Sequence, residues 1–164
     1  MIIISNTSPI TSLAAIGRLE LLQQLYDTII IPEAVYRELT EVESPVPGTL
    51  EVQTLDWIEV RQLADSSIIS TLFQQPLDPG ESEAIALAIE LNAELLLIDE
   101  RRGRTEANRL GVTITGLLGI LTEAKNQALI EAVKPLLDNL INTAKFRVSE
   151  RLYALILETV GEQS

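Results

Sequence analysis

Residues 94–99 read Glu94-Leu95-Leu96-Leu97-Ile98-Asp99, an apolar strand that ends abruptly in a carboxylate. Two other short runs have the same apolar character, Ile2-Ile3-Ile4 at the start of the chain and Ile29-Ile30-Ile31 further along. A strand that is apolar at every position is buried on both faces, as in a parallel sheet covered by helices on each side. The three runs therefore predict an α/β fold with a mainly parallel central sheet.

Helical signals fill the segments between these strands, so strands and helices alternate along the chain. Thr7 or Ser8 is a suitable N-cap for the first helix, Pro9 a suitable first helical residue and Gly17 a suitable end. The pattern predicts further strands over 57–60 and 112–115, and further helices over 18–26, 32–39, 66–73, 78–92, 103–110, 117–127, 131–141 and 149–160. We expect one domain over 1–164, with 131–164 as a helical C-terminal extension packed on it.

Composition narrows the possible chemistry. The 164 residues include 12 Lys and Arg, 24 Asp and Glu, and neither Cys nor His, which gives a net charge of −12. The absence of Cys excludes disulfides, thiolate nucleophiles and Cys-ligated zinc or iron–sulfur centres. The absence of His excludes a Ser-His-Asp triad and imidazole metal ligands. Any metal held by the remaining side chains is expected to be a hard, oxygen-preferring ion such as Mg²⁺ or Mn²⁺.

No apolar run approaches the ~18 residues that are needed to span a membrane. The N-terminus lacks the basic region of a signal peptide and turns polar at Ser5-Asn6. We therefore expect a soluble, cytoplasmic protein without a membrane partner. The phosphate-binding motifs G-x-x-x-x-G-K-[ST] and G-x-G-x-x-G are also absent. The sequence therefore gives no motif evidence for a P-loop or for a dinucleotide cofactor.

Ligands of parallel α/β sheets bind beyond the carboxyl ends of the strands. In this chain those positions are residues 6–8, 99–102 and 115–116. Asp99 is the strongest candidate there, because a charge at the end of an apolar strand has no packing value. The alternative is that Asp99 is the N-cap of the helix that follows it.

A basic cluster follows Asp99 directly. Arg101, Arg102 and Arg104 begin the next helix, where the helix dipole disfavours cations. With Arg109 they place four of the 12 basic residues within nine positions. Contact with phosphate groups would account for this placement, and a solvated helix face is the alternative.

Two further acids are candidates by their place in the pattern. Glu81 begins the helix after Asp78, and 99 − 81 = 18 residues separate it from Asp99. One helix running back along the sheet, followed by one strand running forward, brings Glu81 and Asp99 to the same edge. A capping box with Asp78 is the alternative for Glu81. Glu38 lies near the end of the predicted helix 32–39, where the dipole disfavours an acid, and taken alone it would be a surface carboxylate.

Four motifs follow one another over most of the chain. They are Ile2-Ile3-Ile4-Ser5-Asn6-Thr7-Ser8-Pro9, Gly80-Glu81-Ser82-Glu83-Ala84-Ile85-Ala86-Leu87-Ala88, Leu97-Ile98-Asp99-Glu100-Arg101-Arg102-Gly103 and Ala124-Lys125. In this order and spacing the chain resembles PIN-domain proteins, and more narrowly a prokaryotic branch described as predicted nucleic-acid-binding. The resemblance implies a three-layer α/β/α sandwich that gathers acids around Mg²⁺ or Mn²⁺ and hydrolyses phosphodiester bonds, usually in single-stranded RNA. Many proteins of this kind are toxins of toxin–antitoxin pairs.

The resemblance assigns roles by position in the motifs. Asn6 matches the first acid of the family pattern, Glu38 the second, Glu81 the third and Asp99 the fourth. The four are thus implied as the catalytic set, and the three acids among them as the metal ligands. An amide at position 6 supplies a neutral oxygen where the family has a carboxylate, although two Mg²⁺ ions need several anionic ligands.

The same resemblance implies that Thr7 and Ser8 line the pocket, and Arg101, Arg102 and Arg104 would hold the phosphates of the nucleic acid. Two functions stay open at this point. The chain is either a metal-dependent ribonuclease or, because of Asn6, a catalytically impaired module that binds nucleic acid or protein. A response-regulator-like Mg²⁺ domain is a weaker third alternative, since such domains normally have paired acids after the first strand.

The predicted helix 149–160 indicates a partner. It is apolar on nearly all sides, with Leu152, Tyr153, Leu155, Ile156, Leu157 and Val160. Burial in the protein's own core accounts for part of this surface, and a homodimer or another protein would cover the rest. The strongly acidic chain also suits a basic partner such as an antitoxin.

Overall fold

The structure, a computed structural model, describes residues 1–163. At its centre lies a five-stranded sheet in the order β3-β2-β1-β4-β5, and every neighbouring pair of strands is parallel. The strands are β1 (Ile3–Ser5), β2 (Ile29–Pro32), β3 (Ile58–Arg61), β4 (Leu95–Leu97) and β5 (Ile114–Thr115). Each lies within two residues of its predicted bounds, so the predicted α/β fold with a parallel sheet is confirmed.

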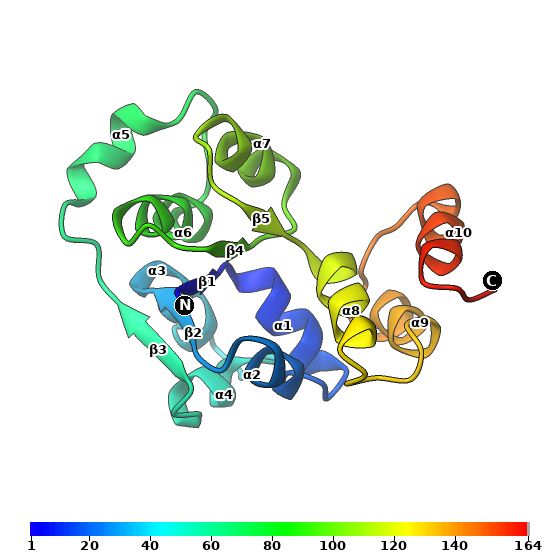
Figure 1. Cartoon of the computed structure of the whole chain (residues 1–164). Coiled ribbons are helices and arrows are strands. Elements are labelled where there is room, and N and C mark those ends of the chain that lie inside the picture. Colours follow the sequence, from blue (N-terminus) through cyan, green and yellow to red (C-terminus); the bar gives the residue numbers. More distant parts are fainter. Residues whose placement is uncertain (164) are drawn as a thin grey trace.

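Helices cover both faces of this sheet (Figure 1). The α-helices of the described residues are α1 (Thr7–Ala15), α2 (Glu20–Tyr26), α3 (Glu33–Thr40), α4 (Thr49–Thr54), α5 (Ile69–Leu72), α6 (Pro79–Glu90), α7 (Arg101–Arg109), α8 (Leu117–Asn126), α9 (Lys134–Thr143) and α10 (Glu150–Thr159). One apolar core joins the sheet to α1, α2, α8 and α9, and a second joins its other face to α6 and α7. The molecule is therefore the three-layer α/β/α sandwich that the resemblance implied.

Burial of the strands follows their place in the sheet. All residues of β1 and β2 are buried, because both strands lie inside the sheet and are covered on both faces. In β3, at the edge of the sheet, only Ile58 is buried. The apolar runs that predicted a doubly covered sheet are thus the strands with helices on both sides.

The structure differs in detail from the predicted helices at two peripheral places. The predicted helix 66–73 is a 3₁₀ turn (Ser66–Ile68) followed by the single turn of α5, and neither contains a buried residue. Ile69, Leu72 and Phe73 pack against the second core only partly buried, and so small an apolar face does not hold a longer α-helix. The short α4 was not predicted, since its six residues show no helical period, and Gly48 precedes it at φ +103°.

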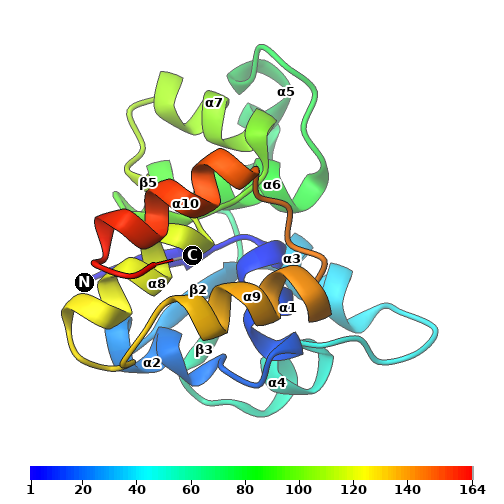
Figure 2. The same cartoon turned by 90° about the vertical axis from the view of Figure 1, so that its right-hand side faces the viewer.

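The last two helices lie on the far side of α8 from the sheet (Figures 1 and 2). In α10, Leu157 is buried, whereas Leu152 and Leu155 are exposed. The carboxylate of Glu162 fixes this region. It accepts hydrogen bonds from the backbone N–H groups of Val133 (2.7 Å) and Lys134 (2.9 Å) and from Lys125 Nζ (2.8 Å). None of the helices within residues 1–163 has the length and apolar character to cross a lipid bilayer.

Candidate functional site

The carboxyl edge of the sheet brings together residues that follow β1, β4 and β5. Ser5 pairs with Leu97, and the N–H of Asn6 donates to the carbonyl of Leu97 at 2.9 Å, which extends the contact of the two strands by one residue. Leu97 pairs in turn with Thr115 of β5. Asn6 and Asp99 therefore lie at one edge, as the sequence predicted.

Asp99 accepts a hydrogen bond from the start of α8 and not from the start of α7, which follows it directly in the sequence. Its Oδ1 accepts a hydrogen bond from the N–H of Leu117, the first residue of α8, at 3.0 Å. The N-cap of α7 is Glu100, whose side chain makes no capping bond. The alternative prediction that Asp99 caps the following helix is therefore wrong. The backbone N–H at the N-terminus of α8 stabilises the carboxylate and fixes its orientation.

Glu81 lies in the first turn of α6 and is only 7% exposed. Asp78 is the N-cap of α6, and its Oδ1 accepts from the N–H of Glu81 at 2.7 Å, as the capping interpretation predicts. The reciprocal half of a capping box is missing, because Oε2 of Glu81 is buried and has no hydrogen-bond partner in residues 1–163. Capping accounts for Asp78 and leaves the carboxylate of Glu81 unexplained.

Three buried side-chain oxygens lack any hydrogen-bond partner, and no other buried side-chain nitrogen or oxygen of residues 1–163 does. They are Asn6 Oδ1, Glu81 Oε2 and Asp99 Oδ2. Such orphaned atoms are rare and cost ~1–3 kcal/mol each. All three belong to predicted site residues, and all three are hard oxygen donors of the kind that Mg²⁺ and Mn²⁺ prefer.

Both buried carboxyls hold their protons unusually tightly. Burial, with smaller contributions from Asp78 and Glu100, raises the pKa of Glu81 to about 8. Burial also raises the pKa of Asp99, against the N–H of Leu117 and the charge of Arg104, which lower it. A cation beside either group would favour its ionised form.

Each of the three acids lies against a glycine of another element. A Cβ atom at Gly103 would stand 2.7 Å from Glu81 Oε2, and one at Gly116 would stand 2.5 Å from Asp99 Oδ1. At Gly80 it would overlap the carboxylate of Glu38. These separations are below 3.0 Å, which real Cβ atoms essentially never show. A side chain at any of these glycines would displace the carboxylate beside it.

Glu38 is joined to two neighbours at this edge. Its Oε2 accepts from the hydroxyl of Thr7 at 2.5 Å and its Oε1 from the N–H of Gly80 at 3.1 Å. Ser8 donates to Glu100 Oε1 at 2.9 Å. The prediction that Thr7 or Ser8 caps the first helix is wrong, because the N-cap of α1 is Asn6, without a side-chain capping bond. Both hydroxyls bind acids at this edge instead.

The predicted basic cluster divides into two parts. Arg104 lies beside Asp99. A Cβ atom at Gly116 would contact both the guanidinium of Arg104 and the carboxylate of Asp99. Arg101 and Arg102 are exposed in the first turn of α7. Arg109 lies at the other end of α7 and forms an ion pair with the buried Glu106 of the same helix (3.0 Å). Its charge is therefore neutralised within α7.

The donor set fits a hard divalent cation in its chemistry, but it is not a preformed cluster of three acids. Within residues 1–163, no three Asp or Glu side chains gather closely enough to form a metal site. Glu38 uses both oxygens in hydrogen bonds. Shared metal ligation by Glu38, Glu81 and Asp99 stays a prediction.

A pocket of about 400 Å³ opens beside Asp99. One part of its lining comes from α1 and the segment around Asp99, and the other from the segment between α9 and α10. The lining residues are Ser8, Thr11, Ser12, Asp99, Glu100, Leu117, Ala144, Lys145, Phe146 and Arg147. Lys145 and Arg147 could not be predicted from the sequence, because no motif marks them and they follow Asp99 by more than 40 residues.

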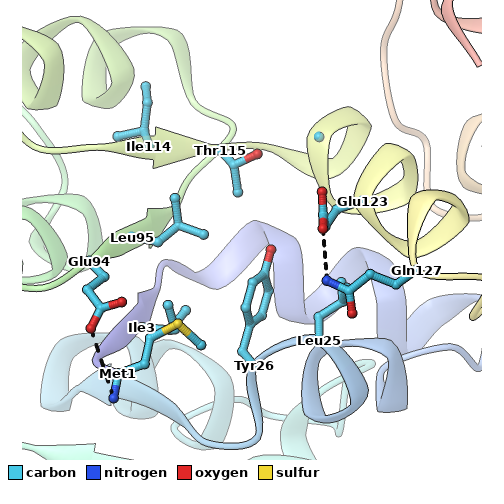
Figure 3. A pocket seen from close by; sticks show the side chains of 11 residues that line it. Met1, Ile3, Leu25, Tyr26, Glu94, Leu95, Ile114, Thr115, Glu123 and Gln127 are labelled. Atoms are coloured by element: carbon cyan, nitrogen blue, oxygen red, sulfur yellow. Dashed lines mark hydrogen bonds and ion pairs between the residues drawn. The ribbon is translucent and has the colours of Figure 1, made fainter.

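A larger pocket of about 520 Å³ contains none of the predicted catalytic, metal-binding or nucleic-acid-binding residues, although Thr115 at the end of β5 lines it (Figure 3). It is lined near the amino ends of the strands by Met1, Ile3 and Glu94, and by Tyr26 and Glu123 from α2 and α8. Burial, together with the charge of Glu123, raises the pKa of Tyr26 to about 12. Size alone therefore does not locate the candidate site, and the orphaned oxygens at the carboxyl edge are the more specific signal.

Comparison with known proteins identifies the family. A family model described as PIN domain matches residues 2–162. No curated protein matches the chain. A similar solved structure is a PilT N-terminus domain protein from the hyperthermophilic archaeon Sulfolobus solfataricus P2, with a TM-score of 0.53, 18% identity, and coverage of 92% of this chain and 99% of that chain. At this identity the likeness concerns the fold. Because the family model spans nearly the whole sequence, the chain belongs to the PIN-domain family.

Proposed function

We propose that the chain is a metal-dependent nuclease that cleaves single-stranded RNA. PIN domains are typically nucleases and generally use divalent metal ions. One observation carries the proposal for this chain: the buried side-chain oxygens of residues 1–163 that lack partners belong to Asn6, Glu81 and Asp99. A binding site for a hard cation gives these costly orphaned atoms a reason.

Glu38, Glu81 and Asp99 are the proposed ligands of Mg²⁺ or Mn²⁺, and Asn6 adds a neutral oxygen. When bound, such an ion lowers the pKa of a coordinated water and offsets charge on the phosphoryl oxygens. The raised pKa values of Glu81 and Asp99 mean that cation binding is coupled to proton release.

The other residues of the site position these groups. The N–H of Leu117 orients Asp99, while Thr7 and the N–H of Gly80 orient Glu38. Arg104 stands beside Asp99, where a guanidinium can bind the phosphate of the strand next to the cleaved bond. Burial of the Asp99 carboxyl strengthens its hydrogen bond with the N–H of Leu117.

The test is cleavage of end-labelled single-stranded RNA with Mg²⁺, with Mn²⁺ or with EDTA. We expect cleavage that requires metal and that falls by at least about 100-fold in Asp99→Asn, as on loss of a group that stabilises the transition state. Glu158→Gln is the matched control, because it removes one exposed acid of α10 that makes no side-chain hydrogen bond in residues 1–163. Absence of cleavage with either metal, or equal rates in both variants, would contradict the proposal.

Nucleic-acid binding without cleavage is the second candidate, favoured by two observations at the same edge. Position 6 is an amide, and Glu38 has both oxygens engaged in hydrogen bonds. The variant Asn6→Asp separates the candidates. Inactivity of the natural chain with recovery in Asn6→Asp would establish a binding protein that has lost its activity.

The biological role that we propose is that of a toxin in a toxin–antitoxin pair. The net charge of −12 suits a basic antitoxin. Induced expression should arrest growth of a bacterial host, and Asp99→Asn should abolish the arrest at equal protein level. Growth arrest by both forms would exclude nuclease activity as its cause.

A further inference from the structure

The basic residues of this acidic chain fall into two groups. Six of the 12 take part in ion pairs, namely Arg18, Arg37, Arg61, Arg109, Lys125 and Lys134. The other six form neither an ion pair nor a side-chain hydrogen bond within residues 1–163, and they are Arg101, Arg102, Arg104, Lys145, Arg147 and Arg151. All six lie in two short segments, 101–104 and 145–151. Because acids outnumber bases two to one, this concentration of unpaired cations calls for a ligand.

Both segments place a cation near Asp99. Arg104 approaches Asp99 from α7, at the position of Gly116. Lys145 and Arg147 line the same pocket as Asp99, although they come from the segment between α9 and α10 (orange in Figure 2). Unpaired cations from both segments therefore lie near the carboxylate that we propose as a metal ligand.

The segment 145–147 is held against the protein in a defined conformation. The N–H of Phe146 donates to the carbonyl of Leu140 at 3.0 Å, and the phenyl ring packs on the core. Lys145 and Arg147, on either side of this anchor, are exposed. Lys145 also has φ +60°, a conformation in which Gly or Asn is more usual after a helix. The anchor fixes the backbone that carries the two cations.

We propose that Lys145 and Arg147 form one wall of a channel for a single strand of nucleic acid that passes Asp99, and that they bind its phosphates together with Arg104. This inference rests on the proposed function. It adds substrate contacts at two residues that lie outside the four sequence motifs. A chain of net charge −12 repels a polyanion at long range, so binding depends on local cations. The pocket volume of about 400 Å³ lies within the ~300–1,000 Å³ range of ligand sites, which suits one nucleotide of a flexible strand better than a rigid duplex.

The experiment compares two double variants of equal charge. Lys145→Gln/Arg147→Gln and Arg18→Gln/Arg61→Gln both change the net charge from −12 to −12 − 2 = −14. Arg18 and Arg61 pair with surface acids away from the pocket, so the second variant is the matched control. Fluorescence anisotropy with labelled oligouridine RNA, in Ca²⁺ buffer and at several KCl concentrations, gives the slope of log Kd against log salt.

We expect this slope to fall by about 1.4 in Lys145→Gln/Arg147→Gln, at about 0.7 for each phosphate contact on a single strand. The control should keep the slope of the natural chain. Thermal melts report folding, and Lys145→Asn/Arg147→Gln is the alternative variant if Gln at position 145 destabilises the fold, since Asn tolerates a positive φ.

Each outcome decides a different point. Equal slopes in the two variants would overturn this inference even if the chain cleaves RNA. Binding with the expected loss but without cleavage in Mg²⁺ or Mn²⁺ would leave the channel intact and overturn the proposed nuclease. No binding of single-stranded RNA or DNA by the natural chain would overturn both. Tighter binding of a duplex, or of polyglutamate, than of oligouridine would overturn the single-strand channel.

Discussion

The buried carboxyl of Glu81 lowers the stability of the folded protein when it is ionised. Its carboxyl is nearly fully buried, one oxygen has no partner, and its pKa is raised to about 8 from a usual value near 4.5. The folded state therefore holds the proton more tightly than the unfolded state does. The stability contributed by protonated Glu81 is fully present below pH 4.5 and is lost as the pH rises towards 8.

The variant Glu81→Gln tests this linkage because it cannot ionise. In EDTA we expect its free energy of unfolding, relative to the natural chain, to rise between about pH 5 and pH 8, by up to about 1.4 kcal/mol per pH unit. Urea unfolding at several pH values measures the difference, with Glu158→Gln as the control. Addition of Mg²⁺ should stabilise the natural chain more than Glu81→Gln. A difference that does not change with pH would contradict the raised pKa.

Single residues also show where sequence reasoning reaches its limit. Asp99 and Glu81 could be located because strand and helix boundaries place them at one edge. Thr7 and Ser8 could not be interpreted locally, since their hydroxyls bind Glu38 and Glu100, which lie 31 and 92 residues away. A capping rule considers only neighbours in the sequence, and a long-range acid competes successfully with the backbone for the same hydroxyl.

At the scale of elements, α6 is the helix that the sequence predicted best. Asp78 caps it, Pro79 occupies its first position, and its apolar residues enter the second core. The signals of capping and burial agree in this helix, whereas the side chains of the predicted helix 66–73 are only partly buried and the segment forms a 3₁₀ turn and one α-helical turn. Long regular helices form where local and tertiary preferences agree.

Removal of the cap of α6 should have a pH-dependent cost. Asp78→Ala loses the hydrogen bond from the N–H of Glu81, worth about 1 kcal/mol. Asp78 also raises the pKa of Glu81, so its loss relieves part of the strain on ionised Glu81. We expect a larger destabilisation near pH 5 than near pH 9 in urea unfolding. Asp78→Asn, which keeps a capping oxygen, should retain most of the stability at the lower pH, and an unchanged Asp78→Ala would refute the capping role.

The junction of α8, α9 and the C-terminal segment depends on Glu162. Although burial raises its pKa, the charge of Lys125 and the N–H groups of Val133 and Lys134 lower it by more. Glu162 therefore stabilises the folded state at pH values above the usual pKa of a glutamate. This stabilisation is lost as the pH falls through the lowered pKa. Glu162→Ala should lose about 1–3 kcal/mol at neutral pH, with the hydrogen bonds of a charged group. Hydrogen exchange should show the loss of protection first in α9, and uniform protection would contradict this assignment.

At the scale of the whole molecule, the outermost helix is the least enclosed. Leu155 of α10 is 54% exposed and Leu152 is 39% exposed. The position of α9 and α10 could not be predicted from the sequence, because it depends on Glu162 and on packing between segments far apart in the chain. Periodicity predicts that a helix has an apolar face, but not which surface covers it.

A homodimer through α10 would cover these leucines. We expect light scattering coupled to size exclusion to give the mass of a dimer, and Leu155→Glu to give a monomer, because an ionised side chain in an apolar interface is costly. Leu50→Glu is the matched control, since Leu50 of α4 is 64% exposed and lies far from α10 (Figure 1). A natural chain that elutes as a monomer over a range of concentrations would exclude the dimer.

The glycines that lie against the acids have a consequence for how the site can change. Gly80 of α6 accommodates Glu38 of α3, Gly103 of α7 accommodates Glu81 of α6, and Gly116 before α8 accommodates Asp99 after β4. The contacts of Glu38 and Glu81 share α6, so they link α3, α6 and α7. Because each acid touches its glycine, we expect the free-energy changes of substitutions at the two positions not to add independently. A smaller side chain in place of the acid should then lower the cost of a side chain at the glycine.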